Sequence, residues 1–422
     1  MSGEVSPART GSRARDPLSI AAGVAFLLLV ISLTGPIAPM GITTALCGVL
    51  TLACLARAAA PSSGRVRLAW PRTPVDRAAV GWFVALLVAS VFALDPATSL
   101  PRISKGLMPA LVGLAAFHAA DRANGRRALA VYLVTVGVVS ALGLAAWIAA
   151  GHGYTWRARG LSHHYMTFGG QLLLEFPVAL AVALTTRDAR WRLGAVAVAG
   201  LTAAALAATF TRSAWLGAFA ASAVVLGGVW PLGLGVLGAL AAGAWVLTTG
   251  EWRDRLHGMF DPSHGYNGER LLMWGAGWRM FLSDPLTGVG LSDMHEVYPA
   301  FRSPAATEEI GHLHSTFVQI AATMGVLGLV AFGWLYASLF RAAAALGPLR
   351  GLAARLRAGG PAAGLRLGVT AALVGFLVAG VFEWNFGDEE LLYHLYTLVG
   401  LAWGSRAWER ADGDAPRAGR AT

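Results

Sequence analysis

Histidines and isolated arginines, set between long apolar runs, are the residues of this chain that could do chemistry. His163 and His164 form one pair, His312 and His314 form a second, and Arg212 stands alone between two apolar runs. A near-neutral imidazole can take a proton from a hydroxyl, and a planar guanidinium suits phosphate oxygens. Held near a bilayer face, such groups could bind an anionic lipid headgroup and carry out proton chemistry on it.

His314 opens an apolar segment, residues 314–328, that reads HSTFVQIAATMGVLG. At the outer end of a spanning helix, its imidazole could act as a general base towards an attacking hydroxyl. An interfacial histidine that only hydrogen-bonds a backbone carbonyl is an equally good interpretation. The His312–His314 pair and the His163–His164 pair could also suggest a metal site. No Asp-x-Asp pattern accompanies them, so the sequence predicts no metal and no other cofactor.

Several arginines stand where membrane topology gives no reason for them. Arg212 lies at a membrane boundary, where a guanidinium is costly unless it is paired, and its planar fork suits phosphate oxygens. Snorkelling towards lipid headgroups is the structural alternative. Arg270 and Arg159, which precedes Gly160, are similar candidates, and Arg157 is close enough to replace Arg159 in this role.

Acidic residues are few and fall in two places. Glu175 lies inside an apolar run, where a carboxylate is functional by default, although a buried partner such as an arginine would explain it as well. A second group clusters at the outer end of the eleventh apolar run, where it could balance arginines or bind an acceptor, although a plain polar loop explains most of it. This group comprises Glu383, Asp388, Glu389 and Glu390. For His118 and His394, we expect core histidines with one hydrogen bond each.

The composition is that of an integral membrane protein. Of the 422 residues, 56% are hydrophobic and 13% are charged, with a mean hydropathy of +0.57. A soluble domain has about 25% charged residues. The net charge of +10 comes from arginines scattered through short loops, with Lys105 the only lysine, so nucleic-acid binding is not expected. Cys47 and Cys54 share one apolar run, which excludes a disulfide framework and a zinc site.

The apolar runs predict an all-α polytopic membrane protein with about twelve transmembrane helices, each of roughly 20 residues. The first follows a polar N-terminal segment without a cleavage site, so we expect an uncleaved span. The predicted spans are 18–35, 37–57, 78–95, 105–120, 128–149, 167–186, 191–210, 213–229, 231–249, 315–340, 366–384 and 391–406. They divide the chain into helices 1–9 (1–249), a long outer loop (250–314) and helices 10–12 (315–422).

The distribution of basic residues predicts the orientation. With the N-terminus inside, the cytoplasmic segments hold 23 of the 33 basic residues, so both termini should be cytoplasmic. Three outer segments then carry polar residues, namely 150–166, the turn 211–213 and the loop 250–314. In the long loop, apolar residues at 271, 274, 278 and 281 follow helical spacing and predict a helix along the membrane surface.

These motifs, in this order, resemble the O-antigen ligase/O-antigen polymerase superfamily of bacterial inner-membrane glycosyltransferases. Residues 211–217 read TRSAWLG, and the long loop holds Arg270 with Trp274 and then DPLTGVG at 284–290. His314-Ser315 follows, with Gln319 and the glycines 325 and 328. The resemblance covers residues 150–330 by motif and the whole chain by topology. Ser315 stands where the family often has Asn, but Gln319 and Gly325 fix the register on His314.

The resemblance implies a GT-C-like fold and a ligase of lipopolysaccharide biosynthesis. Its donor would be a glycan on undecaprenyl pyrophosphate, and its acceptor a sugar hydroxyl of lipid A–core at the periplasmic face, with neither metal nor ATP. His314 matches the catalytic base, while Arg159, Arg212 and Arg270 match the pyrophosphate-binding arginines. His312, Arg157, Gln319 and Glu389 are supporting candidates. Attack on the anomeric carbon would invert it.

Alternatives share this donor or this topology. An O-antigen polymerase or a protein O-glycan ligase would use the same lipid-linked glycan. A flippase for a polyprenyl-linked sugar would also need outer arginines, but it should place charges at mid-membrane and show inverted repeats. The sequence shows one such charge, Glu175, and no repeat. Ligation to lipid A–core is therefore the function that the sequence favours.

Overall fold

The computed structural model describes residues 16–59, 68–263, 266–308, 310–344 and 352–408. All regular elements of this part of the chain are helices. The predicted cytoplasmic arginines at positions 9, 13, 15, 65, 67, 350, 410, 417 and 420, and both chain ends, lie outside the described residues. The prediction of an all-α chain is thus confirmed for the described part.

A helix lies at each predicted span. These helices are α1 (Pro17–Ser32), α2 (Ile37–Ala59), α3 (Asp76–Val91), α5 (Leu111–Ala119), α6 (Arg122–Ala149), α7 (Tyr165–Thr185), α8 (Ala189–Ala208), α9 (Arg212–Val229), α10 (Gly233–Leu247), α14 (Thr316–Ala343), α16 (Gly360–Gly380) and α17 (Glu389–Gly404). The fourth span is composite, because the 3₁₀ helix η2 (Leu100–Ala110) precedes α5. Proline lacks a backbone N–H, and Pro101 and Pro109 therefore disfavour a regular α-helix there.

Seven of the described helices are long and apolar enough to cross a membrane: α2, α6, α7, α8, α9, α14 and α16. The number becomes eight if α10 and α11 (Gly250–His257), which are bent by 117°, form one broken span. Helices α1, α3 and α17 have 16 residues each, which is short of a full crossing. The chain is therefore a polytopic helical membrane protein, and the number twelve stays a prediction.

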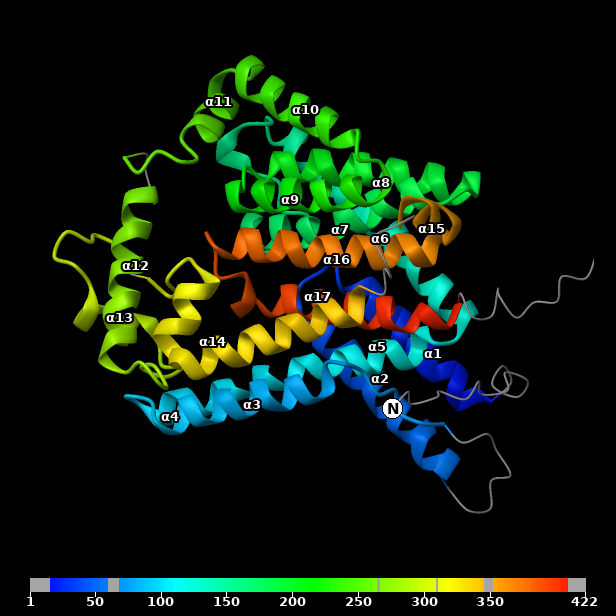
Figure 1. Ribbon diagram of the computed structural model, residues 1–422, viewed down its shortest axis with the longest axis horizontal. Coiled ribbons are helices and arrows are strands. Elements are labelled where there is room, and N and C mark those ends of the chain that lie inside the picture. Colours follow the sequence, from blue (N-terminus) through cyan, green and yellow to red (C-terminus); the bar gives the residue numbers. More distant parts are fainter. Residues whose placement is uncertain (1–15, 60–67, 264–265, 309, 345–351, 409–422) are drawn as a thin grey trace, which may run out of the picture.

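Helices α7 and α16 form the centre of the bundle, where both are buried along most of their length. Gly364 and Gly368, one turn apart on α16, lie against α7. A Cβ at either position would come within 2.7 Å of the α7 backbone, at Val182 and Val178 respectively. Such small-residue pairs allow membrane helices to pack with their backbones in close contact. Helix α9 packs against both α16 and α7 (Figure 1).

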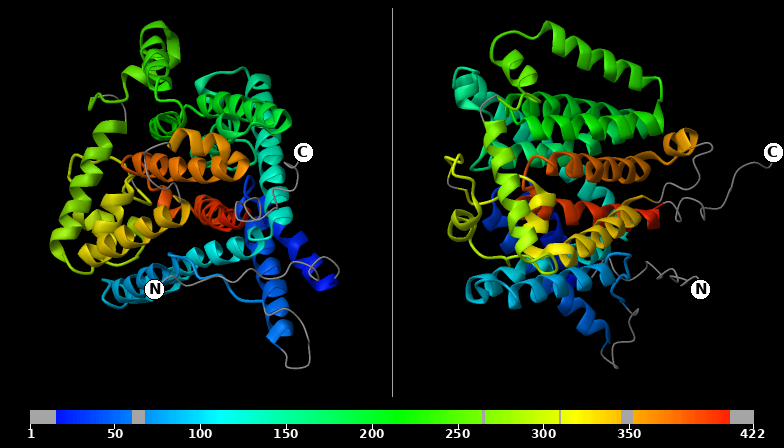
Figure 2. Two further views of the ribbon diagram at one scale, coloured as in Figure 1. Left: turned by 45° about the vertical axis from the view of Figure 1, so that its right-hand side comes forward. Right: turned by 60° about the vertical axis from the view of Figure 1, so that its left-hand side comes forward.

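The two ends of the bundle differ. One end, on the left in Figure 1, carries α4 (Pro96–Ser99), α11, α12 (Tyr266–Ser283) and α13 (Met294–Phe301), whereas α15 (Leu352–Ala358) lies at the other. We call the first the loop end. It also carries the short 3₁₀ helices η3 (Tyr154–Trp156) and η4 (Asn385–Gly387). Figure 2 shows the same separation from two further directions.

A helix is present where the surface helix was predicted. This helix, α12, runs across the helix ends at a steep angle to the bundle (Figure 1). Met273, Ala276 and Met280 form its buried face, whereas Leu271 and Trp278 are exposed. The exposed apolar pair is what a helix lying in a membrane surface would present to lipid.

A break in α14 is bridged by the loop that follows α12. Gly325 has φ 60° and ψ −155°, a conformation that interrupts the helix and is open almost only to glycine. The carbonyls of residues 322 and 323 accept hydrogen bonds from Val289 and Gly290, and the N–H groups of residues 326 and 327 donate to Pro285 and Leu286. The loop thus replaces the hydrogen bonds lost at the break, which a membrane would otherwise leave unsatisfied.

Two histidines and one glutamate within the bundle have polar neighbours. His118 lies 2.8 Å from the Thr51 hydroxyl, and His394 lies 2.8 Å from the Tyr132 hydroxyl, as expected for core histidines. Glu175 has His394 as its ionisable neighbour, with 4.0 Å between Oε1 and Nδ1, where the sequence had suggested an arginine. Cys47 and Cys54 are buried and form no disulfide with each other.

Candidate active site

A cavity of about 280 Å³ opens at the loop end of the bundle. Four arginines and one carboxylate line it, among the described residues. Its lining comprises Tyr154, Arg157, His164, Tyr165, Met166, Phe210, Thr211, Arg212, Ser213, Arg255, Tyr266, Arg270, Met273, Glu308 and His314. The excess of guanidinium groups makes the cavity strongly positive, and the low dielectric of its partly buried walls strengthens the field inside.

Arg212 is held at the start of α9 by the tight turn that precedes it. Phe210 has a positive φ of 51°, and its ring packs against Trp252 with 4.2 Å between ring centroids. The Arg212 guanidinium donates to the Gly258 carbonyl and to Asn267 Oδ1, each at 2.7 Å. Both acceptors are neutral, so the positive charge of Arg212 is fixed in place without being neutralised by them.

Arg255 and Arg157 add two more charges beside the same turn. Arg255 comes from α11 and donates to the Phe210 carbonyl at 3.3 Å. The Arg157 guanidinium lies 3.7 Å from the ring centroid of Tyr154 and 4.2 Å from that of Tyr165. Burial lowers the pKa of Arg157 to about 10, with the charge of Arg255 acting in the same direction, so Arg157 is still charged at neutral pH.

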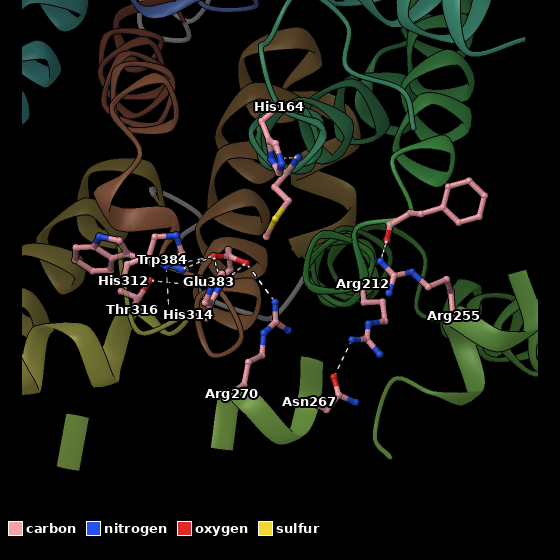
Figure 3. A network of polar contacts seen from close by, with 12 residues as sticks. His164, Arg212, Arg255, Asn267, Arg270, His312, His314, Thr316, Glu383 and Trp384 are labelled. Atoms are coloured by element: carbon pink, nitrogen blue, oxygen red, sulfur yellow. Dashed lines mark hydrogen bonds and ion pairs between the residues drawn. The ribbon is translucent and has the colours of Figure 1, made fainter. Parts of the chain in front are cut away.

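Of the two arginines that the sequence placed before α7, it is Arg157 that lines the cavity. Arg159 is exposed and lies outside the lining. The pKa of the neighbouring His164 is lowered by the burial of His164 and by the positive charge of Arg159. Arg212, Arg270 and His314 are brought together as the sequence predicted. Figure 3 shows His164, Arg270 and His314 converging from different elements.

His314 pairs with a buried carboxylate, Glu383, in the loop after α16. The distances from His314 Nδ1 to the two carboxylate oxygens are 3.0 and 3.3 Å. Arg270 approaches the same carboxylate at 3.4 Å, and the backbone N–H of Trp384 donates to it at 3.2 Å (Figure 3). Burial alone would raise the pKa of Glu383, but the hydrogen bond from His314 and the charges of His314, His312 and Arg270 lower it below the usual value.

This pairing decides which imidazole nitrogen can do chemistry. A carboxylate that accepts from Nδ1–H fixes the tautomer in which Nε2 carries the lone pair, as in a serine-protease triad. His314 Nε2 is then the atom that can take a proton in the cavity. Glu383 contacts His314 but does not line the cavity, so the arrangement suits a positioning residue for His314.

The residues that follow His314 hold it in an unusual backbone conformation. His314 has a positive φ of 45°, a strained value for a residue with a side chain. Ser315 caps α14 by accepting from the Val318 N–H at 3.4 Å, and Gln319 Oε1 accepts from the Leu313 N–H at 2.8 Å. The Ser and Gln of the His-Ser-x-x-x-Gln motif therefore fix the backbone on both sides of His314 and hold its imidazole at the start of α14.

His312 lies next to the His314–Glu383 pair but does not hydrogen-bond the Glu383 carboxylate. Its Nδ1 is 3.9 Å from Glu383 Oε1 and accepts from the His314 N–H at 3.4 Å. Burial lowers the pKa of His312 to about 4, helped by the charge of His314, so this imidazole is neutral at physiological pH. The register on His314 that the sequence favoured thus matches the better-oriented imidazole.

The two histidines and Glu383 form a group whose donor atoms lie within 4.8 Å of one another. Two imidazoles and a carboxylate could hold a divalent cation. However, Glu383 is already bonded by His314, Arg270 and Trp384, and a guanidinium beside a metal ligand is repulsive to the cation. The observed contacts therefore favour a hydrogen-bonded pair over a metal centre.

Glu389, the acidic residue that the sequence favoured, pairs with Lys105 at 3.1 Å and lies outside the arginine cavity. The sequence grouped Glu383 with other loop acids and did not single it out. Arg255 and the tyrosines 154 and 165 were also missed. The sequence offered only a weak indication of Glu383, because it is a single carboxylate beside Trp384 at the end of an apolar run.

A comparison with protein families covers part of the chain that forms this site. Residues 195–333 match the family model described as O-Antigen ligase. That region runs from α8 to the middle of α14, and it includes Arg212, Arg270 and His314. No curated protein matches the chain. The matched region thus supports the O-antigen ligase superfamily, the one that the sequence motifs resemble.

Proposed function

We propose that this chain is an O-antigen ligase, which transfers a glycan from undecaprenyl pyrophosphate to a sugar hydroxyl of lipid A–core. The arrangement that carries the proposal is the arginine-lined cavity with His314 at its wall. A diphosphate carries negative oxygens in a geometry that guanidinium forks match, and partly buried charge-assisted hydrogen bonds are the strong ones. The same cavity offers a base for the attacking hydroxyl.

The surroundings of the cavity suit a donor with a hydrocarbon tail. A groove of about 170 Å³ adjoins it and shares Arg212 and Arg270 with it. Apolar side chains from α9, from the segment between α11 and α12, from α12 and from the loop after α16 form its walls. These include Leu216, Phe260, Leu271, Trp274 and Phe382. An amphiphile with a diphosphate head and a polyprenyl tail would place its head on the arginines and the start of its tail in this groove.

The transfer step requires one proton acceptor and one charged leaving group. The acceptor oxygen forms a bond to the anomeric carbon while the bond from that carbon to the pyrophosphate oxygen breaks. The hydroxyl proton passes to His314 Nε2, and the departing pyrophosphate carries its charge onto the arginines. A general base of this kind contributes about 10²–10⁴ in rate. Direct displacement inverts the anomeric carbon, and the step uses no metal and no cofactor.

The proposed orientation places the loop end in the periplasm of a bacterial inner membrane. Loops with an excess of arginine face the cytoplasm. The opposite end of the bundle carries such arginines, among them Arg122, Arg126, Arg187, Arg190 and Arg341. Lipid-linked donor and lipid A–core would then both reach the cavity from the outer leaflet of that membrane. A GT-C-type architecture and twelve spans belong to this proposal.

The proposal is tested by reconstituted transfer with purified protein, lipid-linked glycan and lipid A–core, comparing Arg270→Ala with Arg279→Ala. Both arginines belong to α12, but Arg279 is exposed and bonds the Phe301 carbonyl, away from the cavity. Hydrogen bonds to charged groups contribute about 1.5–3 kcal/mol. Arg270→Ala should therefore lower kcat/KM for the donor by roughly 10- to 150-fold.

Transfer by Arg279→Ala should stay near that of the wild type. An Arg270→Ala protein that uses the donor normally would contradict the assignment of the cavity. Transfer only to a second lipid-linked glycan would identify a polymerase, and transfer only to a protein a protein O-glycan ligase. Donor that crosses the bilayer without any transfer would identify a flippase.

A further inference from the structure

A second cavity, of about 370 Å³, lies at the loop end beside the His314–Glu383 pair. It is distinct from the arginine cavity, and the two have no lining residue in common. Trp384, which follows Glu383 and donates to its carboxylate, lines the second cavity, as does Gln319, which bonds the backbone before His314. The two cavities therefore flank the segments that hold the base.

The charge of the second cavity is balanced, unlike that of the first. Arg102 pairs with Asp293 at 3.2 Å and donates to the Leu291 carbonyl at 2.6 Å. Lys105 pairs with Glu389 at 3.1 Å and donates to the Gly387 carbonyl at 3.2 Å. The arginine and the lysine in its wall thus each have a carboxylate partner, so the cavity lacks the excess of positive charge found in the arginine cavity.

Its remaining walls combine aromatic faces with hydrogen-bonding groups. Trp82, Trp384 and Phe386 supply the aromatic surface. Ser292, His295 and Gln319 supply hydroxyl, imidazole and amide groups. Aromatic rings pack on the C–H faces of sugar rings, and a few fixed polar groups orient the hydroxyls. The cavity therefore matches a hydroxyl-rich saccharide.

We propose that the acceptor saccharide binds in this second cavity, an inference that rests on the proposed function. The donor pyrophosphate then occupies the arginine cavity. The acceptor extends from the second cavity past Trp384, so that its attacking hydroxyl reaches His314 Nε2 in the arginine cavity. Attack from the side opposite the leaving group is the geometry that an inverting displacement needs. The paired cations Arg102 and Lys105 contact the acceptor as hydrogen-bond donors.

Lys105 allows a selective test because it is the only lysine in the chain. A bulky amine-reactive reagent can modify only this side chain and the N-terminal amine. Modification of the reconstituted wild type should raise the KM for lipid A–core by about tenfold or more. Binding of labelled undecaprenyl pyrophosphate should not change. The Lys105→Arg protein, compared with itself before and after the reagent, should show no change in acceptor KM.

A steric variant gives a second, independent test. His295 is exposed on the first turn of α13 and lines the cavity, so His295→Trp should fill part of it without disturbing the core. The matched control is Glu296→Trp, since Glu296 is also exposed on α13 but lies outside the lining. His295→Trp should raise the acceptor KM about tenfold with unchanged donor binding, and Glu296→Trp should not.

An unchanged acceptor KM after complete modification of Lys105, together with normal kinetics of His295→Trp, would overturn the inference. A loss of donor binding on modification would also overturn it, because the cavity would then belong to the donor. A wild type that binds donor but transfers to no acceptor would instead overturn the proposed function, and with it this inference.

Discussion

At the scale of single residues, the pairing of His314 with Glu383 is the central feature of the site. The sequence pointed to His314, Arg212 and Arg270 through their positions and their motifs. It could not single out Glu383, because the contact joins residues 69 positions apart and several loop acids stood nearby. It also favoured Arg159 equally with Arg212, whereas the folded chain places Arg157 against the tyrosine rings of the cavity.

Replacing Glu383 tests the positioning role directly. Glu383→Gln keeps the size of the side chain but removes the charge that fixes the tautomer of His314. We expect kcat to fall by about 10²–10⁴-fold while donor binding persists. Glu296→Gln, at an exposed position of α13, should retain wild-type turnover. Normal turnover of Glu383→Gln would show that His314 does not depend on this carboxylate.

The lowered pKa of His312 predicts a contribution to acid sensitivity. Its pKa is about 4 in the folded chain, because of burial and the nearby charge of His314, and about 6.5 when unfolded. Between these values the unfolded chain binds more protons, so stability decreases as pH falls from 6.5 towards 4. His312→Asn should therefore lose less thermal stability than the wild type between pH 7 and pH 5.

The control for this measurement is His163→Asn, at an exposed position. It should show the same loss of melting temperature on acidification as the wild type. If His312→Asn lost as much melting temperature on acidification as the wild type, protonation of His312 would not be what destabilises the folded chain.

At the scale of elements, the broken helix α14 and the loop 285–290 form one unit. The sequence showed a turn-rich run and two glycines further on, in the order expected for the superfamily. It could not show that the run supplies the hydrogen bonds missing at Gly325, because the partners lie more than 30 residues apart. The unit joins α12, which carries Arg270, to the helix that begins after His314, so it fixes the two sides of the site.

Gly325→Ala tests this unit. A Cβ at Gly325 would lie 2.5 Å from the backbone of Leu286, and the positive φ is itself strained for alanine. Backbone strain of this type costs about 1–3 kcal/mol, so the melting temperature should fall and the site should lose activity. The control Gly333→Ala lies in the same helix with open space around it and should have little effect. Equal stability of both variants would contradict the bridging role.

At the scale of the whole molecule, the loop end of the bundle carries the cavity, and the opposite end carries the arginines predicted to face the cytoplasm. The sequence predicted this separation well, because apolar runs and loop charges respond directly to the bilayer. It predicted a helix at every span, but not the short lengths of α1, α3 and α17 or the 3₁₀ form of η2. Those depend on how neighbouring helices pack.

Cysteine labelling tests the orientation of the bundle. Ala305 lies at the loop end and Arg190 at the opposite end, and both are exposed. In intact spheroplasts, Ala305→Cys should react with a membrane-impermeant maleimide, and Arg190→Cys should react only after permeabilisation. The native Cys47 and Cys54 are buried, so the wild type should label weakly. The opposite pattern would place the cavity in the cytoplasm.

The most direct test of the account is reconstituted transfer to lipid A–core with EDTA in every reaction, comparing wild type, His314→Ala and His312→Ala. We expect product from wild type and from His312→Ala, and none above background from folded His314→Ala. Loss of activity in His312→Ala alone would place the base on the other imidazole. Loss of wild-type activity in EDTA, restored by a divalent cation, would show that His312, His314 and Glu383 hold a metal, and the account of a hydrogen-bonded base would be wrong.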